Sequence, residues 1–351
     1  MGTFLARRLR YSLLVLLGVV TVVFFLFNVL PADPARLVMG QRSDISSVEN
    51  ARKEMNLDKP MLVRYGLYLN DISPIAVHDK DSIAKAKYHY LQLIPLGSKC
   101  LALKWPYLGR SYRTKKEVSI VLNEALPGTI ILALTAMFIA TVLGILLGVI
   151  AALKKNTWMD TSAIAASVAG ISMPSFFAGL VIAYVFGYLL HSVTGLNMTG
   201  SLWEYDPITG RYLALKNLLL PAIALGIRPL AIITQLTRSS VLDVLSQDYI
   251  RTAYAKGLST TQVVFRHALP NALNPVITAI SGWLAELLAG SFFVEYIFGW
   301  KGVGKITVDA LDKFDFPLVM GSVLLTAFIF IIINLLTDML YGWLDPRVRL
   351  K

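Results

Sequence analysis

The sequence predicts an all-α integral membrane protein with six transmembrane helices and both termini in the cytoplasm. Its 351 residues are 56% hydrophobic and 16% charged, whereas soluble domains carry roughly 25% charged residues. Uncharged runs occupy residues 11–32, 125–153, 161–190 and 316–337, and each exceeds the ~20 residues that a helix needs to cross a bilayer. Two further apolar runs, at about 217–240 and 273–298, are interrupted near their middles by Arg228 and Glu286.

Composition excludes several other classes of protein. The chain is too apolar for intrinsic disorder, and its single cysteine, Cys100, cannot form a disulfide within the chain. Continuous apolar runs do not fit the alternating strands of a transmembrane barrel. The net charge of +11 comes from basic residues scattered over loops, where Lys and Arg orient membrane helices rather than bind nucleic acid.

The first run is predicted to remain as a membrane anchor, because its core of about 20 residues is longer than a signal-peptide core and no A-x-A site follows. The distribution of basic residues sets the orientation. Twelve Lys and Arg residues lie at the two ends and in the second and fourth connections, against five in the short loops opposite. The positive-inside rule therefore places both termini in the cytoplasm.

The predicted organisation has three parts. Residues 1–30 form the N-terminal segment and first helix, and residues 31–118 form an extracytoplasmic loop region with helical stretches near 47–56 and 61–70. Residues 119–351 form a five-helix core that contains a cytoplasmic loop at 241–272.

The cytoplasmic loop predicts two short amphipathic helices. Ile250, Ala253 and Tyr254 share one helical face, and Val263, Val264 and His267 share another. Between them Gly257 supplies a turn and Ser259 can cap the second helix, while Pro270 is expected to interrupt that helix. Such a loop is either a docking element for a cytoplasmic partner or a passive connector on the membrane surface.

The loop resembles the EAA loop of ABC-importer permeases, which reads E-A-A, three residues, G, nine residues, I-x-L-P. The corresponding residues are Arg251-Thr252-Ala253, Gly257 and His267-Ala268-Leu269-Pro270. Arg in the Glu position and His in the Ile position resemble the dipeptide/oligopeptide (peptide/nickel) subfamily. The resemblance extends to 108–113 (LGRSYR), 126–129 (LPGT), 156–160 (NTWMD), 172–176 (SMPSF), 295–304 (EYIFGWKGVG) and 344–349 (LDPRVR). Residues 75–105 look like an insertion.

The resemblance implies the first-permease (B-type) subunit of an importer with a type I ABC importer-like fold. It implies a homologous second permease, two cytoplasmic ATPases that bind ATP and Mg, an extracytoplasmic solute-binding protein, and the inner membrane of a prokaryote. Di- and oligopeptides are the expected substrates, with nickel chelates, oligosaccharides or peptide-like antibiotics as alternatives. The residues expected to couple to the ATPases are Arg251, Thr252, Ala253, Lys256, Gly257, His267, Leu269 and Pro270.

No residue pattern predicts a catalytic centre or a metal site, so the chain is expected not to be an enzyme and to hold no cofactor. Residues 299–305 match G-x4-G-K, but Ile306 stands where a phosphate-binding loop needs Ser or Thr. A secondary transporter or channel that needs no ATPase is the alternative from a different class, and the EAA-like loop argues against it.

Charged and aromatic residues within or beside the spans are candidates for the pathway and its gate, because charges in hydrocarbon are costly. Arg228 and Glu286 are predicted near the middle of neighbouring helices, where they pair directly, contact the second permease or face water. Glu295 and Phe298 follow the fifth span and suggest an outer gate, or else an interfacial aromatic belt. Gly144 and Gly148 form a G-x-x-x-G packing face. Prolines 174, 221, 229 and 275 are expected to interrupt the hydrogen-bond ladders of their helices, which is tolerated where the backbone faces protein or a watery path.

Overall fold

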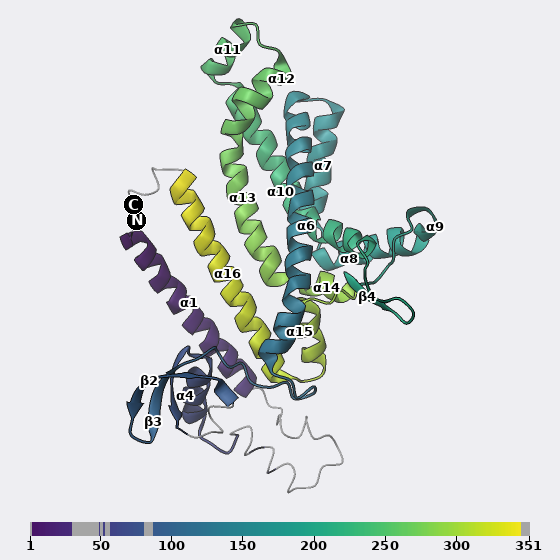
Figure 1. The fold of residues 1–351 in the computed structure, drawn as a ribbon. Coiled ribbons are helices and arrows are strands. Elements are labelled where there is room, and N and C mark those ends of the chain that lie inside the picture. Colours follow the sequence, from purple (N-terminus) through teal and green to yellow (C-terminus); the bar gives the residue numbers. More distant parts are fainter. Residues whose placement is uncertain (1, 30–48, 50–51, 53–56, 81–86, 345–351) are drawn as a thin grey trace. The chain divides into compact units, whose positions relative to one another are not determined.

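The computed structural model describes residues 2–29, 49, 52, 57–80 and 87–344 (Figure 1). Within this part of the chain, five helices are long and apolar enough to cross a membrane, or six if one bent pair forms a single span. The five are Arg7–Asn28 in α1 (Gly2–Val29), α6 (Val118–Leu153), α10 (Lys216–Leu245), Thr260–Ala289, and Phe316–Met339 in α16 (Phe316–Leu344). The predicted all-α membrane fold is therefore confirmed.

The third predicted span is not one straight helix. It consists of α7 (Trp158–Ser172), α8 (Ser175–Ile182) and the π-helical turn η1 (Ala183–Leu189), with a bend of 109° between the two halves. Met173, which precedes Pro174, is extended, with φ −79° and ψ 125°. The proline ring disfavours helical geometry in the residue before it, so the helix ends there and restarts in a new direction.

The other three prolines lie inside continuous helices. Pro221 and Pro229 lie inside α10, and Pro275 lies inside α13 (Leu269–Gly290). Each proline removes only one backbone hydrogen bond, and long membrane helices tolerate this loss where neighbouring groups compensate for it.

The described chain divides into two compact units. One comprises residues 1–12, 125–306 and 326–351, and the other comprises residues 13–124 and 307–325. The core of the first unit contains buried side chains from α6, α10, α13 and the segment after α13, among them Leu132, Ile233, Val276 and Trp300. In the same unit, Arg8 Nη1 lies 2.8 Å from Asp338 Oδ2, which gives the carboxylate near the end of α16 an ionic partner.

The predicted glycine face of α6 is confirmed as a close helix contact. A Cβ atom added at Gly144 would lie 2.7 Å from Ile233 Cγ2, and one at Gly148 would lie 2.6 Å from Thr237 Cβ. Both neighbours belong to α10, so the two helices approach at a distance that only glycine allows.

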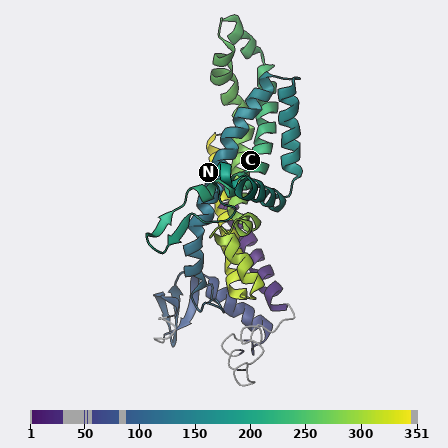
Figure 2. The same ribbon diagram turned by 90° about the vertical axis from the view of Figure 1, so that its right-hand side faces the viewer.

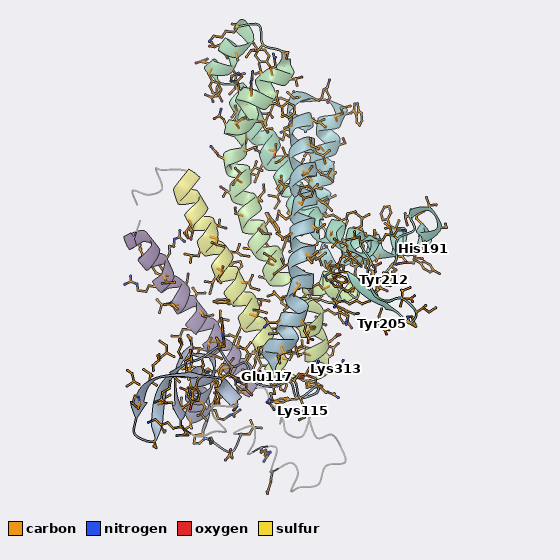
Figure 3. All side chains as sticks on the ribbon, viewed as in Figure 1. Lys115, Glu117, His191, Tyr205, Tyr212 and Lys313 are labelled. Atoms are coloured by element: carbon orange, nitrogen blue, oxygen red, sulfur yellow. The ribbon has the colours of Figure 1, made fainter. Side chains whose placement is uncertain are left out.

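Between η1 and α10 the first unit carries a small projection. It contains α9 (His191–Thr194) and a hairpin of β4 (Trp203–Asp206) and β5 (Gly210–Leu213), in which Tyr205 pairs with Arg211. His191, Tyr205 and Tyr212 lie on this projection (Figure 3).

The second unit contains a folded region after α1. The predicted helix near 61–70 is confirmed as α4 (Met61–Ile72), whose Tyr65 ring lies 5.2 Å from that of Phe24 in α1. Most of the predicted 47–56 helix lies outside the described residues. The apparent insertion folds as an antiparallel sheet in the order β1-β3-β2, with β1 (Ile75–Asp79), β2 (Leu91–Leu96) and β3 (Lys99–Leu103).

Side-chain contacts hold the sheet and the segment that follows it. The His78 ring stacks on Tyr88 with 4.1 Å between centroids, beside the fully buried Cys100. Burial, together with the nearby Lys104 cation, lowers the pKa of His78. Asp315, at the start of α16, accepts hydrogen bonds from Ser111 Oγ (2.5 Å) and Tyr112 N (2.9 Å), which fixes the 108–113 segment.

We expect Gly148→Val to destabilise the protein. The added methyl groups would collide with Thr237 and force α6 away from α10, and overpacking of this kind costs about 1–3 kcal/mol. The midpoint of thermal unfolding of the detergent-solubilised complex should fall. Gly18→Val is the matched control, since a Cβ at Gly18 meets no atom within 4 Å. Equal midpoints for the two variants would contradict the predicted role of the contact.

Candidate coupling loop and translocation pathway

The 241–272 loop forms the two predicted helices at the far end of α10 and α13 (Figures 1 and 2). They are α11 (Asp248–Ala255) and α12 (Thr260–Val263). Gly257 between them has φ +81°, a conformation that favours glycine. Ser259 caps α12 through a reciprocal capping box with Gln262, as the sequence predicts.

On the inner face of the loop, side chains from the two helices pack against each other. Ile250, Ala253, Val263 and Ala268 form one buried cluster. Ala253 is only 6% exposed, so it stabilises the loop rather than presenting a docking surface. Tyr254, which helical spacing placed on the same face, is 42% exposed.

The outer face carries the other predicted coupling residues. Arg251, Thr252, Lys256, Gly257 and Pro270 are exposed, whereas the half-buried Leu269 packs against the cluster of Val149 and Val241. The Phe265 side chain is 59% exposed. It was not among the predicted residues, although a phenylalanine within a polar loop is a signal that the sequence itself shows. Further exposed rings are those of Tyr249 and Tyr254.

Pro270 does not interrupt the helix, contrary to the prediction. The chain continues from α12 through the π-helical turn η2 (Val264–Ala268) into α13, and Thr260–Ala289 runs as one helix. A π-helical turn widens the backbone spiral, which makes room before a residue that lacks an N–H group. His267 is half-buried in this turn, and its carbonyl accepts a 2.8 Å hydrogen bond from Asn271 Nδ2.

Glu295, predicted at the gate, is a buried structural residue. It lies in α14 (Phe292–Ile297), and its side chain is 0% exposed. Its Oε1 accepts hydrogen bonds from Ser291 Oγ (2.5 Å) and Thr129 Oγ1 (2.8 Å), and its Oε2 accepts one from Lys305 N (3.1 Å). Burial raises the pKa of this carboxyl, against the opposing effect of its hydrogen-bond donors.

Gly302 and Gly304, which lie in the segment that matches G-x4-G-K, are next to this carboxylate. Glu295 Oε2 lies beside the start of α15 (Val303–Asp312), whose first backbone N–H groups favour an anion. A Cβ at Gly302 would collide with Glu295, and one at Gly304 would lie 2.9 Å from its Oε2. The position that a phosphate would take is therefore filled by a side chain of the protein itself.

Phe298 is also part of the core rather than of an accessible gate. It is 1% exposed and belongs to the main hydrophobic cluster. Nearby, Trp300 Nε1 donates a 2.9 Å hydrogen bond to the Gly128 carbonyl, which ties the turn to α6. The exposed rings of this region are those of Phe293 and Tyr296.

Arg228 and Glu286 do not form the predicted direct pair. The Arg228 guanidinium lies 5.6 Å from the centre of the Trp283 ring, so the indole takes the position beside the cation. Glu286 is exposed, one turn beyond Trp283, and no ion pair links the two charges among the described residues.

A polar stripe runs along α13. Asn274, Thr278, Gly282 and Glu286 recur at intervals of four residues and are all exposed. A polar surface of this kind is unfavourable against lipid and is found where helices face a watery space or a protein. The regular spacing is visible in the sequence, but the prediction considered only Glu286.

An ion pair between α7 and α10 was also missed. The Arg238 guanidinium contacts both carboxylate oxygens of Asp160, with Nη2 2.7 Å from Oδ2, and the same oxygen accepts a hydrogen bond from Asn156 N at 2.9 Å. Asp160 lies in the NTWMD motif, so the pair holds the beginning of α7 against the end of α10.

We expect Glu295→Ala to lower stability strongly. The variant leaves the Ser291 and Thr129 hydroxyls without their acceptor, and each unsatisfied buried group costs about 1–3 kcal/mol. The control is Glu124→Ala, at an exposed position in α6. Thermal unfolding of the solubilised complex should show a large loss for the first variant alone, and similar midpoints would argue against a structural role.

Two family models match the chain. Residues 144–350 match the binding-protein-dependent transport system inner membrane component, and residues 1–133 match the N-terminal model for membrane components of these systems. A chain of the MetNI methionine ABC transporter in inward-facing conformations has a TM-score of 0.48 at 15% identity, covering 65% of this chain and 97% of that chain.

Curated relatives match over almost the whole length. The di/tripeptide transport system permease protein DppB of Pseudomonas aeruginosa is 36% identical, with 99% of both chains covered. The dipeptide transport system permease proteins DppB of Escherichia coli and Alkalihalophilus pseudofirmus are 35% and 33% identical, with 99% and 98% of both chains covered. With its membrane-spanning helices and these matches, the chain belongs to the family of binding-protein-dependent transport system inner membrane components, the permease subunits of ABC importers.

Proposed function

We propose that this chain is the first permease of an importer for di- and oligopeptides. The observation that carries the proposal is near full-length similarity to permeases that are named for dipeptide and di/tripeptide transport. The proposed assembly contains a homologous second permease, two cytoplasmic ATPases that bind ATP and Mg, and an extracytoplasmic solute-binding protein. It resides in the inner membrane of a prokaryote with both termini of this chain in the cytoplasm.

The exposed outer face of the 248–270 loop is the proposed docking surface for an ATPase. It combines three exposed rings, Tyr249, Tyr254 and Phe265, with the cations Arg251 and Lys256. Aromatic and Arg side chains are the residue types that anchor protein interfaces. Of the other predicted coupling residues, His267 and Leu269 are half-buried and Pro270 is exposed.

Movement at the docking surface can reach the membrane because the helix does not break. Thr260–Ala289 is continuous, and 30 residues of helix span about 45 Å. We propose that closure of the ATPases moves this helix as a lever. The polar stripe of α13 then lines a translocation pathway that opens alternately to the outside and to the inside of the cell.

We expect Gly257→Val to abolish most dipeptide uptake while the subunit still reaches the membrane. A β-branched residue at φ +81° costs on the order of 1–3 kcal/mol, which should distort the turn that holds α11 against α12. Uptake of a radiolabelled dipeptide and ATPase activity stimulated by the binding protein are measured together.

Gly257→Asn is the matched control, since Asn tolerates positive φ and a Cβ at this position meets no atom within 4 Å. It should transport nearly as well as the wild type. Normal uptake by the Val variant would contradict the coupling role. Uptake of nickel chelates or oligosaccharides, but not of dipeptides, by the wild type would contradict the substrate.

If the polar stripe of α13 lines a watery pathway, a cysteine placed in the stripe should be accessible to water-soluble thiol reagents. In a Cys100→Ser background, which removes the only native cysteine, Thr278→Cys should react with a charged, water-soluble thiol reagent because its position faces water. Phe138→Cys is the control: it is also exposed in the chain, but it lies on an apolar face of α6. Reaction at Phe138 with none at Thr278 would place the pathway elsewhere.

A further inference from the structure

Two opposite charges on neighbouring helices have no ionic partner within the part of the chain that the structure describes. Arg228, in α10, contacts the Trp283 ring, and its buried Nε has no hydrogen-bond partner. Glu286, in α13, is exposed. Among the described residues, neither side chain takes part in an ion pair.

These charges contrast with two buried carboxylates of the same unit. Asp160 is paired with Arg238, and the Glu295 carboxylate is surrounded by hydrogen-bond donors. An ionised group inside a membrane-spanning segment is costly and normally faces a partner or a watery cavity. At Arg228 and Glu286 the described chain therefore leaves room for a charged partner that it does not itself supply.

Their placement suits a small molecule with both charges. Trp283 and Glu286 are one turn apart, about 4.5 Å along the axis, and the Arg228 guanidinium lies over Trp283. An extended dipeptide spans at most about 7 Å. Space is available beside them, because a Cβ at the exposed Gly282 would meet no atom within 4 Å.

We propose that Arg228 and Glu286 bind the two terminal charges of a peptide in transit. The Arg228 guanidinium donates hydrogen bonds to the terminal carboxylate, for which its planar fork is suited, and the Glu286 carboxylate accepts them from the terminal ammonium. Trp283 keeps the guanidinium in place. This proposal rests on the proposed peptide substrate. The site recognises the two charged termini of that peptide.

The test measures protection of a thiol by peptides in the purified complex of permeases and ATPases. Gly282→Cys in the Cys100→Ser background is labelled with a thiol reagent in the presence of dialanine, dialanine amide or N-acetyldialanine. Dialanine should slow the labelling, and both capped peptides should do so much more weakly. Adding Arg228→Gln should raise the dialanine concentration for half-protection about tenfold or more, the effect of losing a charge-assisted hydrogen bond, and leave that for dialanine amide unchanged.

Matched variants separate binding from folding. Arg228→Lys keeps the charge and should restore most of the protection by dialanine, and Glu286→Gln should abolish the distinction between dialanine and N-acetyldialanine. Equal protection by free and capped peptides, or no protection at all, would overturn the inference. Cellular uptake of dialanine by the wild type is measured in parallel: its absence would refute the peptide substrate, whereas uptake without thiol protection would refute only this site.

Discussion

The hydrocarbon core of a membrane offers no hydrogen-bond partners, and this constraint determines where each polar group of the structure lies. Hydroxyls inside the long helices bond to their own backbone, as Thr278 does to the Asn274 carbonyl. Ionised groups need an opposite charge or several hydrogen-bond donors. Asp160 meets Arg238 across two helices, and Glu295 meets two hydroxyls and a helix N-terminus. Among the described residues, the Arg228 Nε and the Thr237 hydroxyl of α10 are buried without a hydrogen-bond partner, and exposed polar side chains line one face of α13.

The same constraint explains the contrast between the two carboxylates first grouped as pathway candidates. Glu295 is enclosed because Gly302 and Gly304 let the backbone approach its oxygens. Glu286 is exposed, and no ion pair among the described residues joins it to Arg228, which lies against an indole ring. The same type of side chain is therefore enclosed by hydrogen-bond donors at Glu295 and accessible at Glu286.

Much of the fold follows from local patterns, and the misses have a common cause. Apolar runs predict the helices, Ser259 predicts its cap, and Gly144 with Gly148 predicts a packing face, because each depends on residues close in sequence. Burial of Glu295 depends on Thr129, which is 166 positions away, and no local pattern contains that contact. The four prolines look alike in the sequence, yet only Pro174 ends a helix, since Met173 alone takes the extended conformation.

The glycine contact between α6 and α10 also limits how the permease can move. Gly144 and Gly148 lie against Ile233 and Thr237 with no spare distance, so sliding either helix along the other would bring a larger side chain against the same backbone. Closely packed interfaces shift between discrete arrangements rather than deform gradually. The two helices should therefore travel as a single rigid body, and the displacements of a transport cycle must be taken up at other contacts.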